Sequence, residues 1–253
     1  MAGRSRAAAA AEAHYRRMAA LTGMREGELA EALAAAPAVW IESAARYGLA
    51  EAQVRLGQLL LDGAGMARDP AAALAWFERA AAQGSPDAMN MVGRCLENGW
   101  GRAVDLPGAA AWCRRAAEAG LDWGEYNYAN LLFDGRGVAQ DQAEACAWYA
   151  KAAARGHARA MNLLARCCEE GWGVPHDPAA ARDWYRRAAE AGYFRAQFNH
   201  ATLLAAEGCV GEAADWFERA LAGAPAAARA AMSGTLAQHP EPLIAALARA
   251  MSA

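Results

Sequence analysis

Apolar residues recur along most of the chain at intervals of three, four and seven positions, the pattern of an amphipathic helix. Ala73, Trp76 and Ala80 form one such set, and the same spacing returns 36 residues later. Much of the 56% hydrophobic content is alanine, which favours helix. Few segments combine β-branched and aromatic residues, so strands are not expected. The pattern predicts an all-α protein.

Tryptophans mark an internal repeat, which decides the fold of a chain that contains one. Five of them are spaced by 36 residues and a sixth follows after 32, at Trp40, Trp76, Trp112, Trp148, Trp184 and Trp216. Each opens a similar segment, such as WFERAAAQG or WYRRAAEAG, that ends on a glycine. These glycines are Gly48, Gly84, Gly120, Gly156, Gly192 and Gly223. Since glycine adopts the left-handed conformation just past a helix at low cost, we predict a helix end at each.

A second constant segment lies between the tryptophans. It reads GAGMARDP from Gly63 and GWGVPHDP from Gly171, with close variants from Gly99 and Gly135. The first glycine is predicted to end one helix, and an aspartate to begin the next by accepting from free N–H groups of its first turn. The aspartates are Asp69, Asp105, Asp141 and Asp177, and Pro70 and Pro178 take the first helical position.

Each unit is therefore helix A, a glycine-bounded loop, helix B and a tight turn. Helix A is predicted at about 51–62, 87–98, 123–134 and 159–170, and helix B at about 70–83, 106–119, 142–155 and 178–191. Helices of this length are marginal alone and need neighbours. In helix B we expect the indole to share the packing face with the alanines. Helix A carries a small residue at Gly57, Gly93, Ala129, Ala165 and Ala201, where a neighbouring helix is expected to cross.

Both ends depart from the repeat. We interpret residues 1–253 as one solenoid domain, with an N-terminal helical cap at 1–39, repeats at 40–223 and a C-terminal helical cap at 224–253. The last segment reads as two helices near 225–238 and 241–251. Solenoids need such atypical ends to cover the last apolar face.

The combination of a 36-residue period, paired glycines, aspartate and tryptophan resembles the Sel-one-like repeat family, a relative of the tetratricopeptide repeats. The resemblance covers about residues 40–220. It implies a right-handed superhelix, or α-solenoid, of antiparallel helix pairs. It also implies adaptor work, in which the protein assembles complexes or bridges partner proteins, and it implies no enzymatic activity.

One departure from the family bears on location. Some secreted members carry cysteine pairs eight residues apart, but this chain has alanine or glycine there, for example Ala80 with Ala88. The N-terminus lacks the apolar core of a secretory signal. We therefore expect a cytoplasmic, bacterial-type protein whose six cysteines are buried small hydrophobes.

Charge and motifs argue against other classes of function. The formal net charge of −3 lacks the basic footprint of a nucleic-acid binder, and no apolar stretch is long enough to span a membrane. Histidines, cysteines and GxG loops form no metal, nucleophile or phosphate motif, so we expect no cofactor and no enzyme. A helical-repeat RNA-binding protein and an enzyme or metal protein on a helical scaffold remain alternatives. The sequence does not define the partner or the oligomeric state.

By analogy with tetratricopeptide-like solenoids, helix A lines the concave surface. Residues at i, i+3, i+7 and i+10 share that face. Two units place asparagine and arginine there, and the unit between them places aromatic side chains, which suits a partner-binding groove. The predicted binding residues are Asn90, Arg94, Trp123, Tyr126, Asn130, Phe133, Asn162, Arg166 and Phe198.

Less specific interpretations stay open. Arg94 with Glu97, and Arg166 with Glu169, are alternatively ordinary solvated pairs along a helix. A register shifted by one would move Tyr126 or Phe133 into the core. Trp100 and Trp172, inside GWG loops, are expected to pack on the adjacent turn, with a second contact surface as the alternative.

Overall fold

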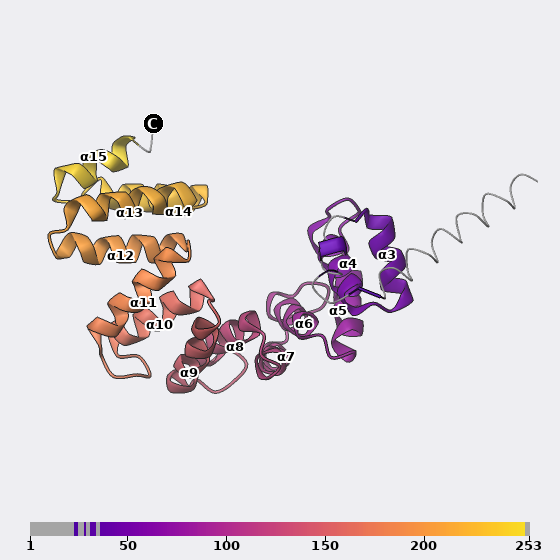
Figure 1. The fold of residues 1–253 in the computed structure, drawn as a ribbon. Coiled ribbons are helices and arrows are strands. Elements are labelled where there is room, and N and C mark those ends of the chain that lie inside the picture. The colour runs from indigo at the N-terminus through magenta and orange to yellow at the C-terminus, as the bar shows by residue number, and fades with distance from the viewer. Residues whose placement is uncertain (1–22, 25–27, 29–30, 34–35, 251–253) are drawn as a thin grey trace, which may run out of the picture. The chain divides into compact units, whose positions relative to one another are not determined.

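The computed structural model describes residues 23–24, 28, 31–33 and 36–250 and, over that range, contains helices and turns but no strand (Figure 1). The all-α prediction is confirmed. Its principal helices are α3 (Ala38–Tyr47), α4 (Ala50–Asp62), α5 (Pro70–Ala82), α6 (Pro86–Asn98), α7 (Leu106–Glu118), α8 (Asp122–Asp134), α9 (Gln142–Ala154), α10 (Ala158–Glu170), α11 (Pro178–Glu190), α12 (Phe194–Ala206), α13 (Val210–Gly223), α14 (Ala226–Leu236) and α15 (Pro242–Ala250).

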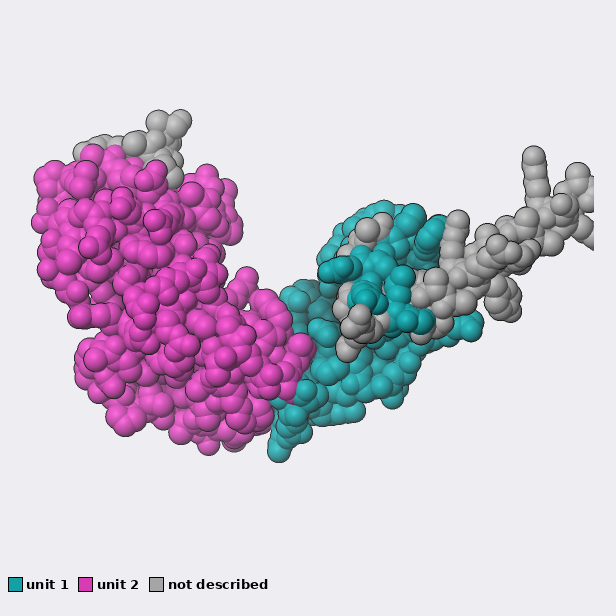
Figure 2. Space-filling view, in the orientation of Figure 1, with its two compact units in different colours: residues 1–119 teal, residues 120–253 magenta. Residues whose placement is uncertain are grey.

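The chain divides into two compact units, residues 1–119 and 120–253, which Figure 2 shows in different colours. In unit 1, α4 packs on α5 and α6 on α7. In unit 2, the pairs are α8 with α9, α10 with α11 and α12 with α13. Helix pairs thus follow one another as the repeat predicts, with bounds within about a residue of the predicted ones.

The predicted caps explain where the helices begin and end. The side chains of Asp69, Asp105, Asp141 and Asp177 each accept from a backbone N–H three residues later, at 2.8 to 3.0 Å. Glycines with positive φ follow most of the predicted helix ends. Gly223 is the exception, because it is the last residue of α13 and Ala224 follows it in an extended conformation. The predicted glycine cap at Gly223 is therefore wrong.

The assignment of tryptophan to the core face of helix B is also wrong. Trp76 is half-buried, and the side chain of the next residue, Phe77, is 0% exposed. Ala73, Phe77 and Ala80 make the buried face, because the i, i+4, i+7 positions point toward helix A. The residues equivalent to Phe77 in the other repeats are also buried: Ile41, Cys113, Tyr149, Tyr185 and Phe217.

Tryptophan instead covers the edge of that face, beneath a cation on the next turn. The guanidinium of Arg79 lies 4.4 Å from the ring of Trp76, and the ammonium of Lys151 lies 3.6 Å from that of Trp148. Three further repeats have the same contact, at Trp112 with Arg115, Trp184 with Arg187 and Trp216 with Arg219. Such pairs contribute roughly 0.5–1 kcal/mol at exposed sites.

The small residue of helix A marks the predicted close approach. A Cβ added to Gly93 of α6 would lie 2.6 Å from the sulfur of Cys113 and 3.2 Å from the carbonyl oxygen of Ala109, both on α7. At Gly57 of α4, a Cβ would lie 2.5 Å from the ring of Phe77 on α5. Glycine therefore lets the two helices of these pairs approach closely.

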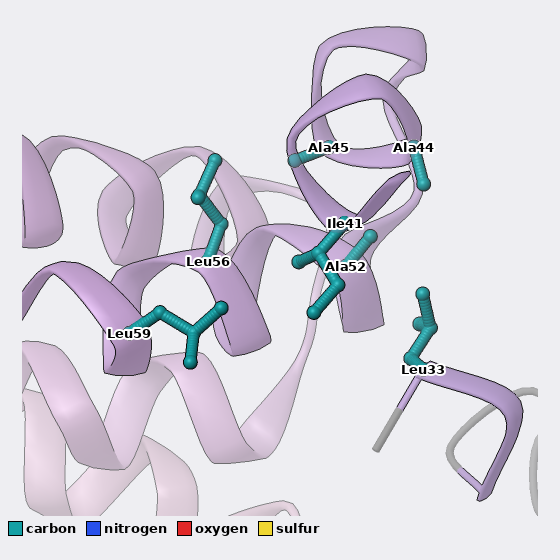
Figure 3. Packing of buried hydrophobic residues seen from close by; sticks show 7 residues of the cluster. All are labelled: Leu33, Ile41, Ala44, Ala45, Ala52, Leu56 and Leu59. Atoms are coloured by element: carbon teal, nitrogen blue, oxygen red, sulfur yellow. The ribbon is translucent and has the colours of Figure 1, made fainter. Parts of the chain in front are cut away.

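A small core closes the N-terminal part of unit 1. Ile41 and Ala45 of α3 pack with Leu56 and Leu59 of α4, and Leu33 completes the cluster (Figure 3). α3, followed by Gly48, carries the predicted WIESAARYG segment and occupies the place of a helix B before α4. Most of the predicted N-terminal cap lies outside the described residues.

The C-terminal cap covers the last helix pair of unit 2. Leu236 of α14 and Ile244 of α15 are buried against Phe217 and Leu221 of α13. The predicted pair of helices near 225–238 and 241–251 is confirmed, slightly shortened, as α14 and α15. These helices cover the last apolar face, as a solenoid end requires.

The cysteines are free thiols, and five of them are buried as predicted, at Cys95, Cys113, Cys146, Cys167 and Cys168. Cys209 differs, because it lies exposed in the short turn between α12 and α13. The prediction of a buried role is therefore wrong for Cys209.

Candidate partner-binding surface

Unit 2 carries a hollow of about 460 Å³ on the face of its A helices. Tyr126 of α8, Asn162 and Arg166 of α10, and Phe198 of α12 line it. These are four of the predicted binding residues. Three helices bring them together because the same repeat positions point to the same side. We call this the central hollow.

Helix α14 forms part of the lining of the central hollow. It contributes Ala228, Ala231, Met232 and Thr235, which share one helical face. Arg229 fixes the start of α14, because its guanidinium donates to the carbonyls of Leu221 (2.9 Å) and Ala224 (3.1 Å) at the end of α13. Sequence reasoning treated this helix only as a cap and missed its contribution to the surface.

An asparagine pair lies at the junction of α10 and α12. The Asn199 amide donates to the Asn162 side-chain oxygen at 3.0 Å. Asn162 lines the central hollow but is only 5% exposed, so it does not present the exposed side chain that the groove prediction expected.

A second hollow of about 240 Å³ adjoins the first, since Leu163 and Arg166 line both. Phe133 and Trp172 form an edge-to-face pair there, with ring centroids 5.5 Å apart. The hydroxyl of Tyr149 donates to Asn130 at 2.7 Å, and burial raises the pKa of that phenol. We call this the anchor hollow.

Trp172 does more than pack on its neighbouring turn, because it joins the two predicted residues Asn130 and Phe133 in the anchor hollow. The guanidinium of Arg166 lies 5.2 Å from its ring, and Glu169 accepts a hydrogen bond from Tyr185 at 2.7 Å. A solvated Arg–Glu pair therefore does not describe these two residues. The recurrence of tryptophan in the GWG loop was the available sequence signal.

A third hollow of about 360 Å³ lies at the N-terminal ends of the A helices, and Arg159 and Tyr193 line both it and the central one. Trp123, 42% exposed, is the most exposed of the predicted aromatic residues. The cation of Arg159 lies 5.3 Å from the Trp123 ring and 5.9 Å from that of Tyr193. Sequence reasoning missed Tyr193.

His157 supports this third hollow from inside. It caps α10, because its Nδ1 accepts from the N–H of Ala160 at 3.2 Å, which places the proton of the neutral ring on Nε2. Its ring lies between Trp123 (4.5 Å) and Tyr126 (4.8 Å). Burial lowers the pKa of His157, which favours the neutral ring.

The two predicted residues of unit 1, Asn90 and Arg94, line none of these hollows. Asn90 is 7% exposed, and Arg94 lies with its guanidinium 5.3 Å from the ring of Trp100. Unit 1 has a hollow of its own, about 580 Å³, lined by other residues that include Glu51, Arg55 and Asp87. The structure thus gathers seven of the nine predicted residues in unit 2 and leaves two outside.

Over the described part of the chain, no three histidine, cysteine or acidic side chains are grouped as ligands of a metal ion. No described helix is both long and apolar enough to cross a membrane. The surface offers aromatic rings, guanidinium groups and amides.

The model of the Sel1 repeat matches residues 50–85, 86–121, 124–157 and 158–193, more than half of the chain. The chain belongs to the Sel1 repeat family. Each match consists of one helix A and the helix B after it, so the four predicted full units are confirmed. No curated protein matches the chain.

Solved structures support the same fold. A Sel1 repeat protein from Oxalobacter formigenes is 28% identical, with a TM-score of 0.66 over 72% of this chain and 75% of that protein. The protective antigen c5321 of uropathogenic Escherichia coli, of SLR fold, is 26% identical, with a TM-score of 0.67 over 88% of this chain. The chain spans about half (49%) of that antigen. Immunity protein PA5088 of Pseudomonas aeruginosa, 18% identical with a TM-score of 0.57 over 80% of this chain and 78% of that protein, shares the fold alone. The α-solenoid class is therefore established.

Proposed function

We propose that this Sel1 repeat protein is a non-enzymatic adaptor that binds a segment of a partner protein along the A-helix face of unit 2. The observation that carries the proposal is the continuity of the three hollows. Arg166 and Leu163 join the anchor and central hollows, and Arg159 and Tyr193 join the central and third. A segment of a partner can follow this surface across α8, α10 and α12.

The side chains on this surface are of the kinds that contribute most to protein–protein affinity. At protein–protein interfaces, substitution of a few residues by alanine weakens binding by about 2 kcal/mol or more. Tryptophan, tyrosine and arginine are enriched among these residues. Trp123, Tyr126 and Arg166 belong to this class, and each is partly held in place by a neighbouring ring. A surface ordered before binding loses less side-chain entropy on association.

Location in a reducing compartment, the bacterial cytoplasm, forms part of the proposal. The six cysteines are free thiols, and the buried ones fill packing positions. Disulfides are common in oxidising compartments and rare in the cytosol.

Quantitative pull-down with crosslinking, using Tyr126→Ala with Phe133→Ala and, separately, Arg166→Ala, tests the surface. We expect both variants to lose the partners that wild type captures, whereas Tyr47→Ala, which removes a 60% exposed tyrosine in unit 1, keeps them. Circular dichroism melts of each variant separate lost binding from lost folding. Unchanged capture by folded Tyr126→Ala/Phe133→Ala would show that the partner binds elsewhere.

The two alternatives, an RNA-binding protein and an enzyme or metal protein, would give different results with the purified protein. An RNA-binding protein would retain nucleic acid that a nuclease releases, with an affinity that falls steeply with salt. A metal protein would carry a stoichiometric ion after purification without chelators. Either result would replace the proposal.

A further inference from the structure

Three arginines gather at the central hollow without an acidic neighbour in its lining: Arg159, Arg166 and Arg195. Each lies over an aromatic ring, Arg159 over Trp123 (5.3 Å), Arg166 over Trp172 (5.2 Å) and Arg195 over Phe194 (5.7 Å). Stacking occupies the flat face of a guanidinium and leaves the N–H groups at its edge to donate. Those donors match the paired oxygens of a carboxylate.

The charge is a property of this end of the repeat array. One position of helix A carries Glu51, Asp87, Trp123, Arg159 and Arg195 in successive units, so its charge changes from negative to positive along the chain. The hollow of unit 1 is lined by Glu51 and Asp87 with a single arginine, Arg55. In unit 2, the two acidic residues of the joined hollows, Asp122 and Asp134, belong to the flanking ones.

The anchor hollow adds an apolar requirement. Phe133 and Trp172 form its aromatic part, and its volume of about 240 Å³ suits one large side chain. Because Leu163 and Arg166 line this hollow and the central one, a side chain held there continues directly into the region of the arginines.

We propose that the partner segment is acidic, with one large apolar side chain in the anchor hollow next to carboxylates that pair with Arg159, Arg166 and Arg195. This inference rests on the proposed function and specifies its ligand. The net charge of the whole chain is −3, so attraction is confined to this surface and a polyanion gains little along the rest of the molecule. That favours a short acidic protein segment over a nucleic acid.

Selection from a displayed library of random peptides of about ten residues, which span roughly 35 Å when extended, tests the inference. We expect enrichment of Asp and Glu around one large apolar residue. Synthetic copies of the enriched peptides should bind Arg166→Glu/Arg195→Glu about tenfold or more weakly than wild type, with an affinity that falls as salt rises. Arg219→Glu is the control, because Arg219 lies on α13 and does not line the central hollow. It makes the same change of charge at one site and should leave peptide binding as in wild type.

Charge reversal gives the decisive comparison. Peptides in which Lys replaces Asp and Glu should lose wild-type binding and recover it on Arg166→Glu/Arg195→Glu. Enrichment of neutral or basic peptides that still need Tyr126 and Phe133 would overturn the acidic ligand and leave the proposed function standing. No enriched peptide, or oligouridine binding more tightly than every enriched peptide, would overturn both.

Discussion

The carboxylate of Glu125 on α8 lies 3.4 Å from the guanidinium Nε of Arg155 at the end of α9. In the first full repeat, residues 50–85, the same two positions hold Gln53 and Gln83. The amide of Gln83 donates a hydrogen bond to that of Gln53 at 2.7 Å. The two remaining full repeats carry apolar residues at both positions, Met89 with Ala119 and Met161 with Ala191. Within the four full repeats, a polar residue in this buried helix-A position thus occurs with a polar partner 30 residues later.

Glu125 is the member of this set with an unsatisfied polar atom. It is 2% exposed, and its Oε2 has no hydrogen-bond partner. Burial raises the pKa of Glu125, against the lowering effect of Arg155. Because the folded state favours the protonated acid, the stability that it provides is fully present below the unfolded pKa and is lost as pH rises through the folded pKa.

Glu125→Gln should therefore stabilise the protein at neutral pH and have little effect in acid. The gain comes from removing a buried charge, because the amide of glutamine still places two polar atoms at this position. It is expected at about 1–3 kcal/mol, the cost of leaving a buried polar group without its full set of partners. Thermal unfolding of both proteins between pH 4 and 8, values that bracket the usual pKa of glutamate at roughly 4.3, measures it. A difference that stays constant with pH would show that folding does not shift the pKa of Glu125.

Gly93→Ala should destabilise unit 1 by about 1–3 kcal/mol, the usual cost of overpacking. The new methyl would meet the sulfur of Cys113 and the backbone of α7 at Ala109. Gly234→Ala in α14 is the matched control, since nothing lies within 4 Å of its added Cβ. The control should stabilise by up to about 1 kcal/mol through helix propensity. Chemical denaturation distinguishes the two, and equal effects would contradict the close approach.

Asp141→Ala should cost about 1 kcal/mol, because the N–H of Glu144 loses its acceptor at the start of α9. Asp141→Asn keeps a side-chain oxygen at the same place and should retain most of the stability. If Asn and Ala destabilise equally in thermal unfolding, the charge of Asp141 matters more than its hydrogen bond.

One thiol of the six should react with a maleimide in the native protein. Cys209 is exposed, whereas burial raises the pKa of Cys95 to about 11 and that of Cys113 to about 12, so few of those sulfurs are thiolates. Mass spectrometry should find one adduct before unfolding and six after it. Cys209→Ser should abolish the native adduct, and several rapid native adducts would show that the buried thiols are accessible.

The sequence by itself determined the helices, their order and their limits. These depend on local chemistry, such as the cap that Asp141 gives α9 and the positive φ of Gly135 after α8, which a short stretch of chain specifies. The 36-residue period then placed equivalent residues on one face, so seven predicted binding residues meet in unit 2.

Tertiary structure alone decided which residues of that pattern are buried. Trp76 and Phe77 are neighbours in sequence, and only the direction of α4 makes Phe77 the core residue. The contribution of α14 to the central hollow and the contact of Trp172 with Phe133 likewise join residues far apart in the chain. Helix limits follow from interactions within a turn or two, but burial depends on which surfaces the packed helices place against one another.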